Sequence, residues 1–508
     1  MERTPPWLTR VGAFAFLTFL LLFVLLGRLW NLQIVRGEEF YARSRATYVR
    51  EVRMEAPRGN ILDRKGRALA TSRTAFNIII VPGKDSLVPM LSPKLAKLLG
   101  VPEEEIRRRA GGKALPYMPI YVAEDVDIST LTKVEEHRPD LPGVEIETAP
   151  RRFYPYGQTS AHLIGYIGEV SKEELRRLKS DGYRPGDWIG KIGVERSYDR
   201  YLRGRPGRRL VMVDAYGRTV RILGVDPPKP GANVYLTIDL DLQRSAEEAL
   251  KGRRGAFVAL DPGSGAVLCM ASSPSFDPNL FARRIRPEEW RRIIGNPAHP
   301  LQNRAVGASA PPGSAFKIIT AAAGLYYGAI TPQTVIHCPG GCYVGRRFFR
   351  CWRRHGAVNL VKAIRESCDT YFYQVALRVG PERLAKMARM FGLGERTGID
   401  IPGEVRGLVP DPRWKRRRLK EPWFGGETAN FGIGQGFLKV TPLQMALVAA
   451  AVANGGKVLR PFVVGKVVDE RGKVIYKAKP KVKRRLPLAP WMLEVIRRGM
   501  FEVCNLPG

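Results

Sequence analysis

The feature that most constrains the fold of this chain is a long apolar run close to its N-terminus. Residues Val11–Val35 contain a single charge, Arg28, and the first part of the run, 11–27, is uncharged. A hydrocarbon layer about 30 Å thick needs roughly 20 apolar residues in a helix, and the long side chain of Arg28 can snorkel to the interface. Because no small-residue cleavage site follows, we expect an uncleaved signal-anchor that spans a membrane at residues 11–32.

The residues around this run predict its orientation. Arg3 and Arg10 precede it, and Trp7 and Trp30 lie where the two membrane interfaces are expected. Residues 1–10 are therefore expected to be a short cytoplasmic tail, with the large remainder outside. This predicts a single-pass protein of the inner (cytoplasmic) membrane whose main domains face the periplasmic or extracytoplasmic side. A buried core hairpin is the alternative, although a terminal run this apolar rarely belongs to a core.

The charge of the chain indicates either an anionic partner or a strongly solvated surface. The 508 residues carry a formal net charge of +35. An excess of this size is typical of proteins that bind nucleic acid, an anionic membrane surface or another anionic polymer. The sequence contains no helix-turn-helix, zinc-finger or aromatic-interleaved RNA signature, so we expect no nucleic-acid partner. Much of the excess is scattered arginine, and a solvated, heat-adapted surface explains it equally well.

The segment PPGSAFK, residues 311–317, combines a helix start with a candidate nucleophile and base. Ser314 follows Pro-Gly and precedes an apolar run, which predicts that its hydroxyl caps a buried helix. Residues three apart on a helix share a face, so the amine of Lys317 should lie beside the Ser314 hydroxyl. A neighbouring base is what activates a weak serine nucleophile. The Ser-x-x-Lys spacing occurs only here in the chain.

Turn residues and hydrophobic periodicity divide the rest of the chain. Alternating apolar residues over 49–54 predict a strand soon after the membrane span. Residues 33–230 form one region, with a polar and partly helical subdomain inserted at about 75–150. After a Pro/Gly-rich joint, strands and helices alternate over residues 231–508. There the segment GAFVALDPGSGAVLCMAS predicts a hairpin that turns at Pro262–Gly265.

Together these segments resemble the class B penicillin-binding proteins, which are membrane-anchored transpeptidases of peptidoglycan synthesis. The resemblance covers nearly the whole chain and rests on six motifs in order. They are RGNILDRKGRALA (58–70), RRFYPYGQTSAHLIGYIG (151–168), GKIGVERSYDRYLRG (190–204), PPGSAFK, SCD (367–369) and GIGQGFLKVTPLQMA (432–446). The Asp in SCD, where Asn is the other option, favours the elongation type of the family, penicillin-binding protein 2, over the division type.

The resemblance also implies a fold. It implies an N-terminal transmembrane helix, an elongated α+β pedestal domain over 33–230 that is not catalytic, and a C-terminal α/β transpeptidase domain over 231–508. In the latter, an antiparallel sheet is flanked by helices. The third active-site motif of the family, Lys-Thr-Gly or Lys-Ser-Gly, is absent, and RTG at 396–398 lies in a different family segment. We therefore expect a transpeptidase domain truncated before this motif and an impaired enzyme in this form.

The pedestal motifs contain no pair of nucleophile and base, so we expect their charged residues to be structural. Arg58 or Asp63 should form an interdomain ion pair with Glu195. The resemblance implies that the transmembrane helix and residues 43–70 bind a polytopic membrane glycosyltransferase of the SEDS family. It also implies scaffold proteins of the elongation complex as partners. The glycine-rich segment at 432–436 lacks the Lys-Ser/Thr of a phosphate loop, and we expect it to pack its backbone closely beside the catalytic cleft.

The reaction that the resemblance implies is acyl transfer on peptidoglycan stem peptides ending in D-Ala-D-Ala, which β-lactams block. Ser314 would attack the penultimate D-Ala carbonyl, with Lys317 as its base. Ser367 would relay the proton to the leaving nitrogen, and Asp369 would hold the hydrogen-bond network. This chemistry requires no cofactor. Taken alone, the segment 367–369 is more typical of a helix cap than of a catalytic element.

Other functions fit parts of the same sequence. A non-catalytic activator or scaffold of a membrane glycosyltransferase would need the pedestal but not the third motif. A β-lactam sensor or β-lactamase would keep Ser-x-x-Lys, but it needs no pedestal, and the sequence shows no deacylating Glu motif. A division-type transpeptidase remains the alternative within the family.

A cysteine-rich segment predicts a structural zinc site near the second motif. Four of the six cysteines and one histidine fall within residues 338–368. Thiolate and imidazole are the ligands that zinc favours in closed tetrahedral sites. The expected ligands are Cys338, Cys351, His355 and Cys368, with Cys342 as the alternate, and some elongation-type relatives resemble this chain in carrying zinc there. A disulfide in an oxidising compartment and inert buried thiols remain open as alternatives.

Overall fold

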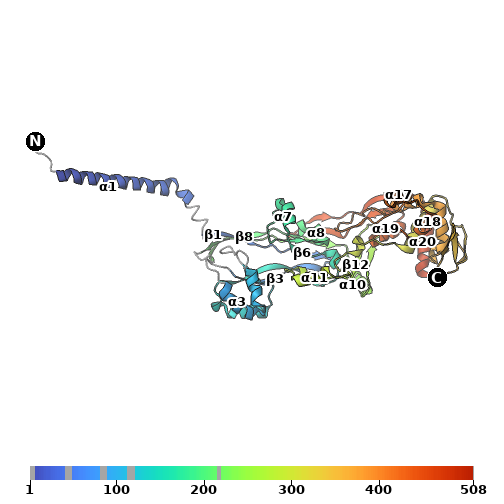
Figure 1. The fold of residues 1–508 in the computed structure, drawn as a ribbon, viewed down its shortest axis with the longest axis horizontal. Coiled ribbons are helices and arrows are strands. Elements are labelled where there is room, and N and C mark those ends of the chain that lie inside the picture. Colours follow the sequence, from blue (N-terminus) through green and yellow to red (C-terminus); the bar gives the residue numbers. More distant parts are fainter. Residues whose placement is uncertain (1–5, 41–47, 81–87, 111–119, 214–218, 507–508) are drawn as a thin grey trace. The chain divides into compact units, whose positions relative to one another are not determined.

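The structure is a computed structural model that describes residues 6–40, 48–80, 88–110, 120–213 and 219–506 (Figure 1). The apolar run forms helix α1 (Pro6–Trp30), which continues into a π-helical turn at Asn31–Val35. Over Arg10–Val35 the mean hydropathy is 2.2, and none of this span is buried against protein. The predicted helix is therefore present and is long and apolar enough to cross a membrane, while residues 1–5 of the expected cytoplasmic tail lie outside the described residues.

The chain folds into two compact units, and the first combines Met1–Ala56, Thr74–Ala149 and Arg205–Lys229. Besides α1, its elements are β1 (Val49–Met54), the second half of β3 (Ala68–Ile80), α3 (Val88–Leu99), α4 (Glu103–Ala110), β4 (Ile120–Ala123), α5 (Ile128–Glu136), most of β5 (Val144–Phe153), β8 (Gly207–Val213) and β9 (Thr219–Asp226). Strand β1 confirms the strand predicted over 49–54, and it lies in an antiparallel sheet of order β1-β8-β9.

The segment expected as an inserted subdomain has a hydrophobic core of its own within this first unit. Val88, Leu91 and Leu95 recur at helical spacing along α3, and they are buried in one cluster with Ile78 and Ile80 of β3. Burying such side chains contributes about 1.5–3 kcal/mol each. The domain boundaries given above stay a prediction.

The second unit combines Pro57–Arg73, Pro150–Gly204 and Pro230–Gly508. Its elements are β2 (Ile61–Leu62), the first half of β3, α6 (Ala161–Ile164), β6 (Ile167–Glu169), α7 (Lys172–Arg177), β7 (Trp188–Gly190), α8 (Gly193–Ser197), α9 (Asp199–Leu202), β10 (Asn233–Leu236), α10 (Leu240–Ala249), β11 (Gly255–Leu260), β12 (Val267–Ser273), α11 (Pro287–Ile294), α12 (Arg304–Gly307), α13 (Lys317–Tyr326), β13 (Ile336–Cys338), β14 (Gly341–Val344), β15 (Arg347–Arg350), β16 (Gly356–Val358), α14 (Leu360–Arg365), α15 (Asp369–Val379), α16 (Pro381–Met390), α17 (Pro412–Leu419), α18 (Gly425–Gly432), α19 (Pro442–Ala453), β17 (Lys457–Arg460), β18 (Val464–Val468), β19 (Val474–Lys477), β20 (Lys481–Arg485) and α20 (Pro490–Asn505).

The strands of the second unit are only partly the antiparallel sheet that we expected. Strands β11 and β12 form the predicted hairpin, with its turn between Leu260 and Val267. The main sheet of the unit runs β19-β18-β10-β2-β3, and within it β10 and β2 pair in parallel. A parallel pair needs a long crossover connection, and the chain between Leu62 and Asn233 supplies one.

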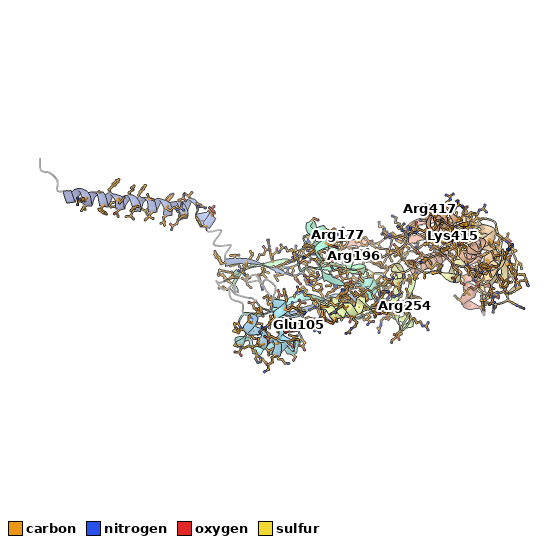
Figure 2. The ribbon with its side chains drawn as sticks, viewed as in Figure 1. Glu105, Arg177, Arg196, Arg254, Lys415 and Arg417 are labelled. Atoms are coloured by element: carbon orange, nitrogen blue, oxygen red, sulfur yellow. The ribbon has the colours of Figure 1, made fainter. Side chains whose placement is uncertain are left out.

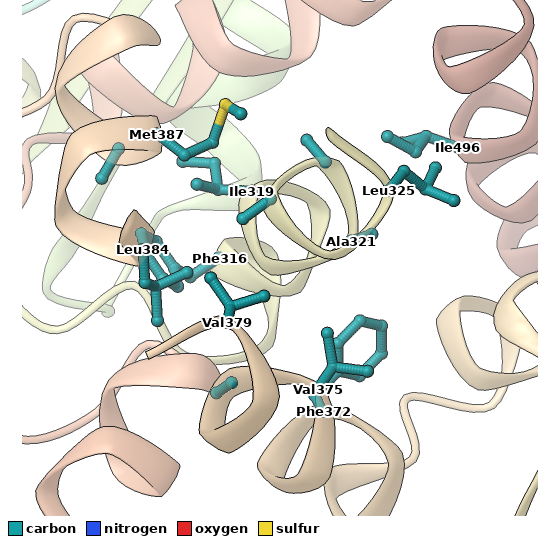
Figure 3. Packing of buried hydrophobic residues seen from close by; sticks show 14 of the residues in the cluster. Phe316, Ile319, Ala321, Leu325, Phe372, Val375, Val379, Leu384, Met387 and Ile496 are labelled. Carbon is teal, nitrogen blue, oxygen red and sulfur yellow. The ribbon is translucent and has the colours of Figure 1, made fainter. Parts of the chain in front are cut away.

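The helices of the second unit enclose its largest hydrophobic core around α13 (Figure 3). Ile319, Ala321 and Leu325 of α13 are buried there. Val375 from α15 and Ile496 from α20 belong to the same cluster. This packing fixes the axis of α13, and with it the position of the residues at its N-terminal end.

A buried ion-pair network holds the motif around Arg58 to the motif around Glu195. The guanidinium of Arg58 lies 2.8 Å from Glu195 and 2.9 Å from Asp199, and Glu195 is fully buried. The predicted pair of Arg58 with Glu195 is thus confirmed, although both residues belong to the same compact unit. Asp63 instead accepts from Arg67 at 2.8 Å, because its carboxylate also closes the turn that contains Arg67.

Basic side chains are spread over the surface of the second unit (Figure 2). Arg177, Arg196, Arg254 and Arg417 are all exposed, and they lie on four separate segments. A scattered distribution of this kind is what a solvated surface requires.

Candidate active site

Ser314 lies immediately before α13. It belongs to a short 3-10 turn, Gly313–Phe316, and α13 begins only at Lys317. Ser314 is exposed, whereas Phe316 and Lys317 are buried. The prediction that the Ser314 hydroxyl caps the helix is wrong. The N-cap of the turn is Pro312, which makes no side-chain capping bond, and the Ser314 hydroxyl accepts a hydrogen bond from another side chain instead.

The buried amine of Lys317 reaches Ser314 through Ser367. Lys317 Nζ donates to Ser367 Oγ at 2.9 Å and to Asp369 Oδ1 at 2.6 Å. Ser367 Oγ in turn donates to Ser314 Oγ at 2.9 Å. All four residues expected at the site therefore converge, but the predicted neighbourhood of the Lys317 amine and the Ser314 hydroxyl is bridged by a second hydroxyl. A hydroxyl can donate and accept at once, so this series of hydrogen bonds can carry a proton in either direction.

Ser367 takes this position through an unusual backbone conformation. It stands between α14 and α15 with a φ of 50°, in the left-handed region that a residue with a Cβ seldom adopts. Its carbonyl oxygen accepts from Lys317 Nζ at 2.8 Å. Asp369 is the first residue of α15, and the N-cap is Cys368, which makes no side-chain capping bond. The segment 367–369 is thus not the ordinary side-chain helix cap that was the alternative.

The glycine-rich segment packs its backbone against the Ser314 turn, as predicted. Gly313 N donates to the carbonyl of Gly434 at 3.0 Å, and Thr320 Oγ1 donates to the carbonyl of Gly432 at 2.7 Å. Gly434 has a φ of 74°, and a Cβ there would lie 2.2 Å from the carbonyl oxygen of Gly313. A glycine is therefore required at 434 by both its backbone angle and its surroundings.

The predicted metal ligands come together beside this site. The ligand atoms of Cys338, Cys351, His355 and Cys368 all lie within 4.8 Å of one another. His355 Nδ1 is 3.5 Å from the sulfur of Cys338 and 3.5 Å from that of Cys351. All six cysteines of the chain are unpaired, which does not support the disulfide alternative. The alternate residue, Cys342, is outside the group.

The thiols of this group interact with one another. A hydrogen bond from the Cys368 thiol lowers the pKa of Cys351, although burial opposes the shift. In a tetrahedral site with zinc–sulfur bonds of about 2.3 Å and zinc–nitrogen bonds of about 2.0 Å, sulfur and nitrogen lie roughly 3.5 Å apart. The distances from His355 to the two thiols agree with this value.

One neighbour of the site was missed by the sequence analysis. Trp352 donates from its indole nitrogen to the carbonyl of Ser367 at 3.2 Å. The only signal in the sequence was an aromatic residue between two predicted ligands, in CWRRH, and such a residue is usually part of a core.

Two protein families match the chain over adjacent segments. Residues 53–236 match the Penicillin-binding Protein dimerisation domain, and residues 255–507 match the Penicillin binding protein transpeptidase domain. The peptidoglycan D,D-transpeptidase MrdA of Acinetobacter baumannii is 38% identical over 454 residues, which is 88% of this chain and 68% of that protein.

Solved structures show the same similarity. The Helicobacter pylori complex between penicillin-binding protein 2 (PBP2) and MreC aligns with a TM-score of 0.77 at 30% identity, covering 90% of this chain and 84% of that one. A structure described as the structural coordination of polymerization and crosslinking by a peptidoglycan synthase complex aligns with a TM-score of 0.72 at 34% identity. It covers 98% of this chain and 85% of that one.

Proposed function

The chain belongs to the class B penicillin-binding protein 2 family of peptidoglycan D,D-transpeptidases, and on that premise we propose that Ser314 is the residue that becomes acylated. The observation that carries the proposal is the unbroken hydrogen-bonded series from Ser314 through Ser367 to Lys317 and Asp369. It joins an exposed hydroxyl, a relay, a buried amine and a carboxylate, which are the parts that acyl transfer requires.

The geometry supports the following sequence of steps. Ser314 Oγ attacks the carbonyl carbon of the penultimate D-Ala while its proton passes along Ser367 Oγ to the amine of Lys317, which acts as the base. The backbone N–H of Ser314 stabilises the oxyanion that forms, a kind of donor whose loss costs about 2.7–4 kcal/mol. Ser367 then returns the proton to the nitrogen of the terminal D-Ala, which leaves as the carbon–nitrogen bond breaks. An amine of a neighbouring stem peptide attacks the ester, and Ser314 regains its proton.

Acylation by penicillin tests this assignment. Full-length protein treated with penicillin and digested should carry the adduct on the peptide that contains Ser314, as mass spectrometry will show. Ser314→Ala should abolish the adduct, whereas Ser245→Ala, an exposed serine on α10, should leave it unchanged. An adduct on another serine would refute the assignment. A purely non-catalytic activator, which the transpeptidase match does not favour, predicts no adduct at all.

We also propose that Cys338, Cys351, His355 and Cys368 hold a structural zinc ion. Transpeptidases of this family need no cofactor for acyl transfer, so the metal would serve to hold the strands of this region against the N-terminus of α15. Support comes from the matching distances between His355 Nδ1 and the sulfurs of Cys338 and Cys351.

Elemental analysis tests the zinc proposal. Protein purified without added metal should contain about one zinc per chain. Cys351→Ser should lower both the zinc content and the melting temperature, because structural zinc contributes directly to folding. The control is Cys504→Ser, at an exposed cysteine on α20, and it should change neither the zinc content nor the melting temperature. Full thermal stability of a zinc-free protein would contradict the proposal.

Finally, we propose that the protein is anchored in the inner membrane by α1 and binds there a SEDS-family glycosyltransferase and scaffold proteins of the elongation complex. Support comes from the exposed apolar helix and from similar proteins solved with MreC and in a peptidoglycan synthase complex. Replacing α1 with an unrelated membrane-spanning helix should abolish co-purification with the glycosyltransferase, while Ser314→Ala should preserve it. Unchanged recovery after the helix exchange would contradict a role of α1 in binding.

A further inference from the structure

Trp352 makes contacts that are unusual for an exposed tryptophan. Its side chain is 60% exposed, and it follows Cys351 in the loop that leads to β16. Its Nε1–H nevertheless points back at the protein and is shared between the carbonyl of Glu366 at 3.0 Å and the carbonyl of Ser367 at 3.2 Å. An exposed indole can equally donate to water, so this orientation has to be imposed by its neighbours.

Two neighbours hold the indole in this orientation. The guanidinium carbon of Arg353 lies 4.6 Å from the centre of the ring, and the same guanidinium pairs with the Glu366 carboxylate at 3.2 Å. The ring of His355 contacts the indole edge to face, with centres 5.2 Å apart. The indole and the guanidinium therefore both bond to Glu366, the residue that directly precedes Ser367.

The peptide that receives these bonds is the strained one at the site. Ser367 has a left-handed backbone, which is unfavourable for any residue that carries a Cβ. Its carbonyl accepts from both Lys317 Nζ and the indole of Trp352. Because the indole N–H is shared by the carbonyls of Glu366 and Ser367, it holds both peptides that flank Ser367, and turning them would move Ser367 Oγ from its 2.9 Å contact with Ser314 Oγ.

We propose that Trp352 is a positioning residue for acyl transfer, and that its indole N–H holds the Ser367 peptide in the conformation that aims the relay hydroxyl at Ser314. The inference rests on the proposed function of Ser314 and Ser367. It assigns Trp352 no contact with the reacting atoms. A side chain outside the hydrogen-bonded series thereby controls the rate of the chemical step.

The test separates the acylation rate constant of full-length protein from its affinity for a fluorescent penicillin. Trp352→Phe keeps an aromatic ring but removes the N–H, and it should lower the rate constant about tenfold, with the affinity changed less than twofold. Trp491→Phe, on α20 and also half exposed, is the matched control and should change neither. Two isosteres sharpen the comparison. The benzothienyl analogue of tryptophan at 352 lacks the N–H and should behave like phenylalanine, whereas 7-azatryptophan retains it and should restore the rate.

A double-mutant cycle shows whether Trp352 acts through Ser367. In a Ser367→Ala background, Trp352→Phe should cause no further loss. The same tenfold loss in that background, or a wild-type rate for the benzothienyl protein, would overturn the inference. So would a change confined to affinity, which would indicate a direct contact with the ligand. A wild-type protein that is not acylated at Ser314 would refute the proposed function itself, and the inference with it.

Discussion

Removing the charge of Glu195 should destabilise the second unit more than any surface substitution. Glu195 is fully buried and accepts from Arg152 Nε at 2.6 Å and from Arg58 at 2.8 Å. Burial alone would raise the pKa of Glu195, but the two guanidinium groups lower it, so the carboxylate is charged in the folded protein. Glu195→Gln keeps the shape but presents an amide N–H to groups that can only donate.

The structure sets the size of this effect. Breaking a buried ion pair by removing one partner costs about 3–5 kcal/mol. We expect the lower end, about 3 kcal/mol, because Arg58 retains Asp199 and Arg152 retains the carbonyl of Gly59 at 2.7 Å. For a unit of roughly 350 residues the unfolding entropy is about 0.7 kcal/mol/K, so the melting temperature should fall by about 4 °C.

Scanning calorimetry with a matched control decides whether this reasoning holds. Glu494→Gln removes the same charge from an exposed pair with Arg497 on α20, where the side chain is 67% exposed. Exposed pairs contribute about 0.2–1 kcal/mol, so its melting temperature should stay within about 1 °C of the wild type. If Glu195→Gln had the same melting temperature as this control, the buried ion pairs of Glu195 with the two arginines would not stabilise the unit, and the argument from burial would be wrong.

Two further predictions concern buried polar side chains. Burial lowers the pKa of His162 to about 4 from its ordinary value near 6.5, so the unfolded chain binds a proton that the folded protein excludes, and stability should fall by up to about 3 kcal/mol as the pH drops from 6.5 to 4. Urea midpoints across this range should show the loss in the wild type and a smaller one in His162→Gln. Lys415 is 2% exposed and pairs with Glu427 at 2.5 Å, so Lys415→Met should destabilise the unit. Arg417 is an exposed neighbour on the same helix (Figure 2). Arg417→Met should leave the stability unchanged, and equal losses of stability in the two variants would contradict the pairing argument.

The parts of the structure that the sequence predicted are those set by local pattern. The apolar run predicts α1 because length and composition alone decide whether a helix can span a membrane. The hairpin of β11 and β12 follows from alternation around a Pro/Gly turn. By contrast, β2 and β10 pair in parallel across the sequence from 62 to 233, and no local periodicity encodes which distant strand lies alongside.

The same distinction applies within the site. Spacing and motif order predicted Ser314, Lys317, Ser367 and Asp369 as site residues, and the fold brings their side chains together. The sequence did not reveal that Ser367 stands between the serine and the lysine, because that arrangement depends on a left-handed backbone at a residue that is not glycine. Nor did it reveal Trp352, whose proposed role depends on the fold returning its loop to the start of α15. Helix periodicity also placed the cap at Ser314, three residues before the point where α13 begins.

The close approach of Gly434 to the Ser314 turn provides a test of how tightly the proposed nucleophile is held. Gly434 and Gly436 have nearly the same left-handed backbone, with φ of 74° and 77°. A Cβ at 434 would lie 2.2 Å from the carbonyl oxygen of Gly313, while a Cβ at 436 has its nearest neighbour 3.9 Å away, on Asn430. An alanine at either position therefore meets the same backbone penalty of about 1–2 kcal/mol, but only the one at 434 displaces the turn that carries Ser314.

Since a misplacement of about 1 Å can reduce a rate about 100-fold, Gly434→Ala should lower penicillin acylation of the full-length protein by about that factor. Gly436→Ala should change the acylation rate less than threefold, although its melting temperature falls as well. Stopped-flow acylation and calorimetry on the two variants separate the clash from the backbone penalty. Equal acylation losses would mean that the left-handed glycines act through general stability. In that case the contact between Gly313 and Gly434 would not be what places the serine.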